Sequence, residues 1–100
     1  MIVYNETVIV EEAAHLEWLN WMKEVQIPHA MATGCFTSHR ILNVMDSPNE
    51  GVTYCIQYHA ETLENFQRFF NLHAQAYQEA QQLQFENRLV QFSTLMQTVD

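Results

Sequence analysis

Residues 2–25 read IVYNETVIVEEAAHLEWLNWMKEV, and within this stretch the spacing of the apolar residues changes from that of a strand to that of a helix. Residues 2–10 are rich in β-branched side chains over a length typical of a strand. From residue 12 to residue 25, apolar side chains recur at helical spacing beside two tryptophans, namely Leu16, Leu19 and Met22. We therefore expect a strand over 2–10 and an amphipathic helix over 12–25.

Pro28 and Gly34 mark the end of this helical region. Proline lacks a backbone donor and restricts the residue before it, so we expect the helix to end or kink near Gln26. Residues 28–34, PHAMATG, then predict a further helical turn, which Gly34 can stop by adopting a left-handed conformation.

The rest of the chain predicts three more strands and a second helix. Residues 35–45 and 51–59 flank the turn-rich segment 46–50, DSPNE, which indicates a β-hairpin. Residues 61–85 carry apolar side chains at three- and four-residue steps, as a long helix does, and residues 89–95 read as the last strand. The order β-α-β-β-α-β predicts one α+β, ferredoxin-like domain over residues 1–100, with an antiparallel four-stranded sheet and two helices on one face.

The charge of the chain excludes some classes of partner. Twelve acidic residues against four basic ones give a net charge of −8, and the basic residues are scattered. Because phosphates would be repelled, we expect no binding to nucleic acid or to anionic membranes. No apolar run approaches the length of a membrane span, and the sequence begins with no leader-like segment, so a cytoplasmic location is the default expectation.

The spacings of cysteine, histidine and glycine predict neither a metal site nor a cofactor. Cys35 and Cys55 stand in no CxxC motif, so we expect two reduced thiols, with a redox pair as the alternative. The five histidines show no HxH or HExxH spacing, and two glycines are too few for a phosphate-binding loop.

Alternate residues of each predicted strand separate two faces of the sheet. One face is mostly apolar and carries Tyr4, Val8, Phe36, Leu42, Val44, Val52, Tyr54, Ile56 and Tyr58. The other is mixed and carries Val3, Asn5, Thr7, Ile9, Cys35, Thr37, His39, Ile41, Met45, Thr53, Cys55, Gln57 and His59. Two helices can cover only one face, and the sequence leaves open which one. We expect a second copy of the chain to cover the other, in a homodimer, the alternative being a face that tolerates water.

Five residues are candidates for binding a small molecule. Asn5, His39, Gln57 and His59 share one predicted face and could line a polar cavity between sheet and helices, or could be polar residues of a partly wet sheet. His73 lies on the apolar stripe of the second helix, where it could serve as a ligand or base, or be a hydrogen-bonded core histidine.

Three segments carry a resemblance to a known family: IVYN at 2–5, EWLNWMKEVQIPHAMATGCF at 17–36 and GVTYCIQYHA at 51–60. They resemble an uncharacterised bacterial family described as a domain of unknown function, over nearly the whole chain. That family is similar to the dimeric α+β barrel superfamily, whose ferredoxin-like subunits pair sheet to sheet. The superfamily includes antibiotic-biosynthesis-type monooxygenases, haem-degrading enzymes, stress-responsive barrels and amino-acid-sensing regulators, so the shared fold does not select a function.

The resemblance to the haem-degrading members is partial. These enzymes place an Asn on the first strand and a Trp and a His on the second helix. Asn5 matches the first of these, whereas Phe66 stands where a Trp would be and His73 falls about one turn early.

The sequence therefore supports three hypotheses. The first is a homodimer that binds a small molecule in a cavity between sheet and helices. The second is a cofactor-independent monooxygenase-like enzyme with His73 as base and Asn5 as an oxyanion-side donor. The third is a structural or protein-interaction role.

Overall fold

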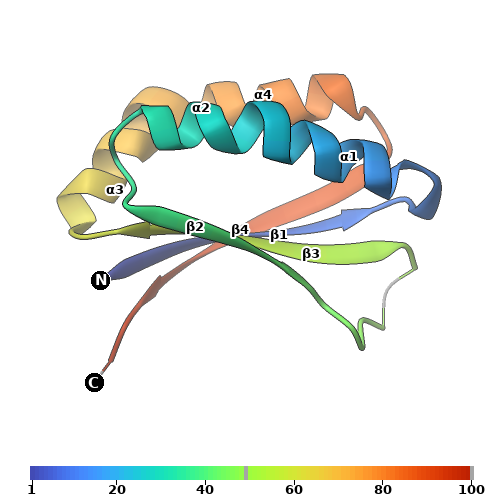
Figure 1. Ribbon diagram of the computed structural model, residues 1–100, viewed down its shortest axis with the longest axis horizontal. Helices are drawn as coiled ribbons and strands as arrows, with labels where there is room; N and C mark the ends of the chain where they lie inside the picture. The colour runs from blue at the N-terminus through green and yellow to red at the C-terminus, as the bar shows by residue number, and fades with distance from the viewer. Residues whose placement is uncertain (49, 100) are drawn as a thin grey trace.

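A four-stranded antiparallel sheet carries two helical segments on one face (Figure 1). The computed structural model describes residues 1–48 and 50–99. The strands are β1 (Ile2–Val10), β2 (Ser38–Asn43), β3 (Val52–Ala60) and β4 (Leu89–Gln97), in the spatial order β2-β3-β1-β4. The first helical segment comprises η1 (Glu12–Ala14), α1 (His15–Trp21), η2 (Met22–Gln26) and α2 (Ile27–Ala32). The second comprises α3 (Leu63–Phe69), η3 (Phe70–Ala74) and α4 (Gln75–Gln84).

This order confirms the predicted β-α-β-β-α-β, ferredoxin-like arrangement. The boundaries of β1 are those expected from the sequence, and β2 and β3 pair as the predicted hairpin. The predicted turn over 46–50 includes Asn49, which lies outside the described residues. Within the described parts of the chain, no helix is both long and apolar enough to span a bilayer.

The sequence predicts that the first helix ends or kinks near Gln26. The predicted end is wrong, because the helical path continues to Ala32. Residues of η2 form a π-helical turn, and Pro28 follows in the first turn of α2. Proline has no N–H to donate at this point, and the wider π-helical turn directly before it lets the helix continue without that hydrogen bond. The helix ends instead before Gly34, whose φ of 76° is left-handed, as predicted.

The second strand is shorter than predicted, and its faces are reversed. Cys35 and Phe36 are buried ahead of the strand rather than within it, and the chain bends at Thr37. This bend shifts the alternation by one residue, so that His39 lies opposite Tyr58 on the helix-covered side. Ile41 likewise lies opposite Ile56, whereas Leu42 points to the other face.

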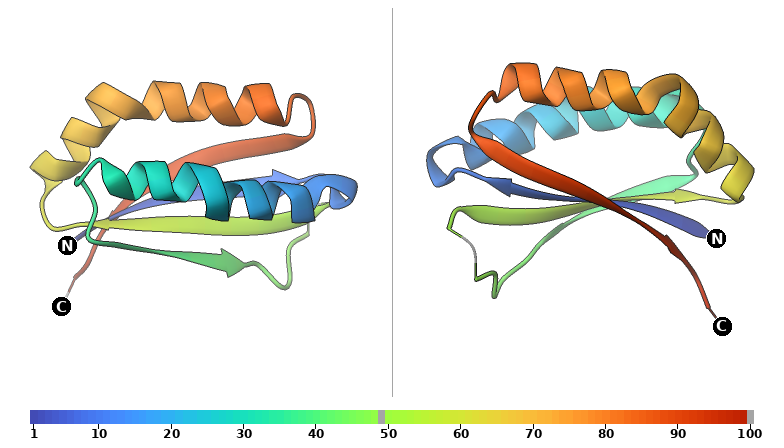
Figure 2. Two further views of the ribbon diagram at one scale, coloured as in Figure 1. Left: turned by 45° about the horizontal axis from the view of Figure 1, so that its top comes forward. Right: turned by 180° about the vertical axis from the view of Figure 1, so that it is seen from behind.

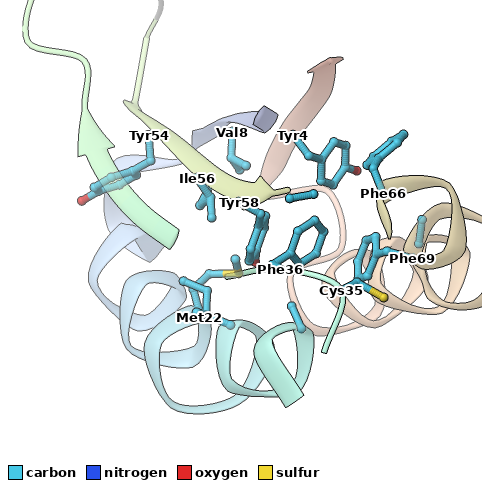
Figure 3. Packing of buried hydrophobic residues seen from close by; sticks show 14 of the residues in the cluster. Tyr4, Val8, Met22, Cys35, Phe36, Tyr54, Ile56, Tyr58, Phe66 and Phe69 are labelled. Carbon is cyan, nitrogen blue, oxygen red and sulfur yellow. The ribbon is translucent and has the colours of Figure 1, made fainter. Parts of the chain in front are cut away.

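Aromatic rings fill much of the layer between sheet and helices (Figure 3). Phe36 lies between Tyr58 and Phe69, with ring centroids 4.9 Å and 4.7 Å away. Tyr4 contacts Phe66 at a centroid distance of 5.2 Å. Each such side chain contributes roughly 1.5–3 kcal/mol when it is fully buried, so this layer stabilises the fold strongly.

Buried hydrogen bonds tie the two helical segments together and to β4. Trp18 Nε1 donates to Gln81 Oε1 at 2.7 Å, and Gln81 Nε2 donates to Gln91 Oε1. Gln26 Nε2 donates to the Tyr77 carbonyl oxygen at 2.8 Å. Since unpaired polar groups would be costly in this layer, these bonds fix how the helices sit on the sheet.

Candidate functional site

The two faces of the sheet present different chemistry. Even-numbered residues of β1 and β3 point to the helices, and odd-numbered residues point to the opposite face, which no helix of the described residues covers (Figure 2). We call this second surface the open face. Its described strand residues are Val3, Asn5, Thr7, Ile9, Ser38, Arg40, Leu42, Thr53, Cys55, Gln57, His59, Val90, Phe92, Thr94 and Met96.

A row of hydrogen-bonded side chains crosses the open face from β2 to β1. Arg40 Nε donates to Gln57 Oε1 at 2.9 Å, and Gln57 Nε2 donates to Asn5 Oδ1 at 3.3 Å. Asn5 Nδ2 donates in turn to Thr7 Oγ1 at 3.0 Å, and Thr7 Oγ1 lies 3.7 Å from Cys55 Sγ. Asn5 is only 6% exposed although no helix covers it. We call these five residues the polar row.

Apolar side chains lie around the polar row, mainly on the outer strands. Phe92 is 56% exposed and Val90 64%, and Leu42 and Met96 are also exposed. Among the described residues of this face none is acidic, although the chain has twelve acidic residues. The open face is therefore the part of this acidic molecule on which two copies can meet without opposing carboxylates.

The structure brings three of the five predicted site residues to one face. Asn5 and Gln57 belong to the polar row, and His59 lies beside it, with its Nδ1 3.0 Å from Ser38 Oγ. All three point away from the helices, so the expectation that they line a cavity between sheet and helices is wrong. The sequence could not show this, because alternation separates two faces without saying which one the helices cover.

The other two predicted residues lie elsewhere. The grouping of His39 with Asn5 is wrong because the bend before β2 turns His39 to the helix-covered side at the sheet edge. His73 lies in η3, where its ring stacks on Tyr77 at 6.1 Å and lies 5.9 Å from Phe69. Asn5 and His73 are thus on opposite sides of the sheet and cannot act together on one substrate as base and oxyanion-side donor.

An acid that the sequence analysis passed over lies on the helix-covered face. Glu6 points to the same side as its neighbours Tyr4 and Val8 on β1, but unlike them it remains partly accessible to solvent. Burial raises the pKa of the Glu6 carboxyl to about 7. The sequence does contain a signal for Glu6. It alternates with Tyr4 and Val8, so it shares a face of the strand with an aromatic and a β-branched residue.

Two tyrosines share this environment. Burial, and to a smaller extent the charge of Glu6, raise the pKa of Tyr4 to about 12. Burial also raises the pKa of Tyr58, followed by the charges of Glu6, Tyr4 and Tyr77. Both phenols therefore stay neutral near pH 7 and can donate or accept hydrogen bonds.

On the side of β4, the surroundings of Glu6 are open to solvent. Ser93 pairs with Glu6 in the sheet and points to the helix side, yet it is exposed, as is Leu95 two residues on. The later part of β4 bends away from the helix layer (Figure 2). The side chains of Ser93 and Gln78 approach the Tyr4 hydroxyl and lower its pKa, against the larger effect of burial. We call Tyr4, Glu6, Gln78 and Ser93 the helix-side site.

A surface hollow adjoins the helix-side site at Gln78. It has a volume of about 410 Å³ and is lined by Phe70, Asn71, Ala74, Gln75 and Gln78. Phe70 is 56% exposed, so this hollow offers an aromatic surface next to polar amides. Gln78 lines the hollow and also approaches Tyr4, so it lies between this outer surface and the buried phenol.

The described residues offer no ready metal centre. Over 1–48 and 50–99, no three His, Cys, Asp or Glu side chains gather closely enough to hold a metal ion. Cys35 and Cys55 are free thiols. The chemistry that the helix-side site can perform is hydrogen bonding and proton transfer.

Comparison with known proteins supports the fold more than the function. The sequence profile of a family described as "Domain of unknown function (DUF4286)" matches residues 1–99, which confirms the kind of family suggested by the sequence. No curated protein sequence matches the chain.

Several solved structures are similar at low identity. A mutant of SnoaB, described as a cofactor-independent oxygenase from Streptomyces nogalater, is 11% identical with a TM-score of 0.70, covering 99% of this chain and 93% of that one. A dimeric ferredoxin-like protein from an uncultured marine organism is 8% identical with a TM-score of 0.66, covering 99% and 94%. A mutant of MhuD with two manganese protoporphyrin IX molecules per active site is 18% identical with a TM-score of 0.59, covering 100% of both chains. At these identities the likeness shows the ferredoxin-like fold alone.

Proposed function

Since this chain belongs to the family described as "Domain of unknown function (DUF4286)", whose description names no activity, we propose a function from the geometry of the chain itself. The protein is a homodimer paired through the open face, and each subunit binds a small, planar, uncharged molecule at the helix-side site. The observation that carries the binding proposal is the accessibility of Glu6 beneath the helices.

The composition of the open face supports pairing with a second copy. Exposed apolar side chains surround the polar row, and the amides of Asn5 and Gln57 at its centre are already hydrogen-bonded, so covering these two amides breaks few bonds to water. At a net charge of −8, two copies repel each other least when they meet on a face without carboxylates. A similar fold described as dimeric favours the same assembly.

The helix-side site supports a ligand because its acid is hard to explain by packing. Val8 and Ile56, on the same face of the sheet, are fully buried, whereas Glu6 keeps contact with solvent beside β4. Placing a carboxyl here lowers the stability of the fold wherever it is ionised. Titratable groups that the environment perturbs in this way are concentrated at functional sites.

The chemistry of the helix-side site favours an uncharged ligand with an aromatic body. The hydroxyl of Tyr4, the amide of Gln78 and the carboxyl of Glu6 offer donors and acceptors without a cation to attract an anion. The exposed ring of Phe70 beside Gln78 offers a surface for stacking. The planar porphyrin bound by the MhuD mutant shows that a similar fold accommodates flat ligands.

Fluorescence titration with 2-naphthol, a planar molecule with one hydroxyl, tests the binding proposal. We expect saturable binding to the full chain, weakened about tenfold or more by Glu6→Leu, since a lost hydrogen bond to a charged or ionisable group is worth roughly 1.5–3 kcal/mol. Glu86→Leu, at an exposed acid elsewhere, serves as the control and should bind as the wild type does. Equal affinity of both variants would rule out Glu6 as part of the site.

Proton transfer is the second candidate function, and the pKa of Glu6 favours it. A base with a pKa of about 7 is well matched to catalysis near neutral pH. The Glu6 carboxylate would take a proton from carbon next to a carbonyl, leaving an enolate, and the carboxyl would then return a solvent-derived proton. Deuterium incorporation into 2-tetralone, followed by NMR, should be accelerated by the wild type and by Glu86→Gln but not by Glu6→Gln. An unaccelerated rate with the wild type would exclude this activity for that substrate class.

A further inference from the structure

A second group of polar side chains, on the open face, has the composition of an anion site. Arg40 and Gln57 face each other across the β2–β3 pair, and Ser38 and His59 face each other one rung further along. Residues two apart on a strand lie about 7 Å from each other on the same side of the sheet, so all four side chains share one patch. This patch lies on the opposite side of the sheet from the helix-side site.

The hydrogen bonds of the patch orient its donors. Arg40 Nε is held by Gln57 Oε1 at 2.9 Å, and Gln57 is held in turn by Asn5. This bond engages Nε and, among the described residues, leaves the two terminal nitrogens of the guanidinium open to a ligand. Nδ1 of His59 is engaged with Ser38 Oγ at 3.0 Å, so its Nε2 is the ring nitrogen available to a ligand.

No carboxylate among the described residues neutralises Arg40. Within residues 1–48 and 50–99, the ion pairs join Arg88 to Glu11 and to Glu17, at the other end of the helices. The described open face contains no acidic residue, so a second copy seated on it supplies none from the same face. Covering Arg40 in a dimer would then leave a cation without a counter-charge, which is unfavourable.

The neighbouring side chains indicate what else the ligand contains. Val3 pairs with His59 on the same face, and Leu42 follows Arg40 two residues along β2. A planar guanidinium fork matches a carboxylate with two parallel hydrogen bonds. A carboxylate joined to an apolar body would therefore satisfy the charge and cover the two aliphatic side chains.

We propose that Arg40, oriented by Gln57 and assisted by Ser38 and His59, binds the carboxylate of a small apolar acid between the two sheets of the dimer. This inference rests on the proposed pairing through the open face, and it concerns a ligand different from that of the helix-side site. The ligand carboxylate provides the negative charge that the open face lacks.

Calorimetric titration of the full chain with sodium benzoate tests the proposal. We expect binding to the wild type, at least tenfold weaker binding to Arg40→Gln, and unchanged binding to Arg68→Gln, a variant with the same loss of charge on α3. Benzamide, which has the same ring without the charge, should bind at least tenfold more weakly than benzoate. Absence of benzoate binding, or equal affinities of the two arginine variants, would overturn the proposal.

Sedimentation of the same samples separates this inference from the assembly on which it rests. A dimer that fails to bind benzoate contradicts the anion site alone, whereas a wild-type monomer contradicts the pairing and the inference together. If Arg40→Gln weakens the dimer while benzoate binding is absent, a carboxylate of the second copy occupies the patch and the ligand proposal is wrong.

Discussion

Asn5 and Glu6 are neighbours on the central strand β1, yet they lie in two opposite environments. Asn5 points to the open face, where Gln57 and Thr7 satisfy its amide at 3.3 Å and 3.0 Å. Glu6 points beneath the helices, where burial raises its pKa to about 7. Two polar residues of the same strand therefore behave differently. The amide of Asn5 is neutral and satisfied within the sheet, whereas the carboxyl of Glu6 gains or loses a proton near neutral pH and is available to a ligand.

The amides of Asn5 and Gln57 at the centre of the open face are neutral and bonded to each other, so they carry the same charge over the ordinary pH range. The helix-covered face carries one acid among aromatic rings, and its charge changes near neutral pH. The first arrangement suits a permanent interface, and the second suits binding or proton transfer. Substitutions on the two faces should therefore differ in how much they change stability or assembly, and in whether that change depends on pH.

The largest expected difference between the faces is in folding stability. Trp18→Ala removes a fully buried ring that contacts Tyr54 at 5.0 Å and donates to Gln81, and should lower the free energy of unfolding by about 3–5 kcal/mol. Phe92→Ala on the open face should cost the isolated subunit less than about 1 kcal/mol. Urea denaturation at a protein concentration low enough to dissociate dimers checks both, and equal losses would break the comparison.

The next effect is on assembly. Phe92→Glu places a charge on the open face and should weaken the dimer about 100-fold or more, which corresponds to about 2.7 kcal/mol. Leu83→Glu is the matched control, because Leu83 is 82% exposed on α4 and receives the same charge. Analytical ultracentrifugation distinguishes them, and a Phe92→Glu dimer as tight as the control would place the interface elsewhere.

Glu6→Gln should stabilise the protein at alkaline pH. The folded-state pKa of about 7 lies above the ordinary 4.5, so the folded state binds the extra proton between these values. The contribution of Glu6 to stability is therefore present below pH 4.5 and is lost as the pH rises through 7. We expect a gain of about 1–3 kcal/mol for the variant at pH 8 and little gain at pH 4.

Urea denaturation at both pH values measures this gain, with Glu86→Gln as control. A gain that is the same at pH 4 and pH 8 would show that Glu6 does not titrate as described.

The smallest effect should come from the polar row. Asn5→Ala leaves Gln57 and Thr7 without one hydrogen-bond partner each and should cost about 1 kcal/mol. Because no carboxyl is involved, this loss should be equal at pH 5 and pH 8, in contrast to that of Glu6→Gln. Thermal denaturation at the two pH values decides whether this contrast holds.

Much of the fold was predictable because it follows from local periodicity. The β-branched residues over 2–10 predict a strand of the length observed for β1, and the spacing over 61–85 predicts the helical path through α3, η3 and α4. The continuation of the first helix through Pro28 was not predictable, since it depends on the π-helical turn of η2. The bend at Thr37 likewise reversed the faces of β2 without a signal in the spacing.

The candidate site was only partly predictable, because it depends on which face the helices cover. Asn5, Gln57 and His59 are together as predicted, but on the open face rather than beneath the helices. Glu6 was not predicted as a site residue, although it lies among apolar residues of β1. Its burial results from the packing of the helices over β1, which the local sequence does not show. Ser93 and Gln78 reach Tyr4 from β4 and α4, and no local pattern announces such a contact.

The most direct test of the difference between the two faces is a carbon-13 NMR titration of the Glu6 side-chain carboxyl in the intact protein. The signal is assigned by comparison with Glu6→Gln, and the exposed carboxyls of the same sample serve as internal references. The structure predicts a midpoint near pH 7 for Glu6, whereas a midpoint near 4.5 would show that the acid is fully hydrated and would contradict the helix-side site.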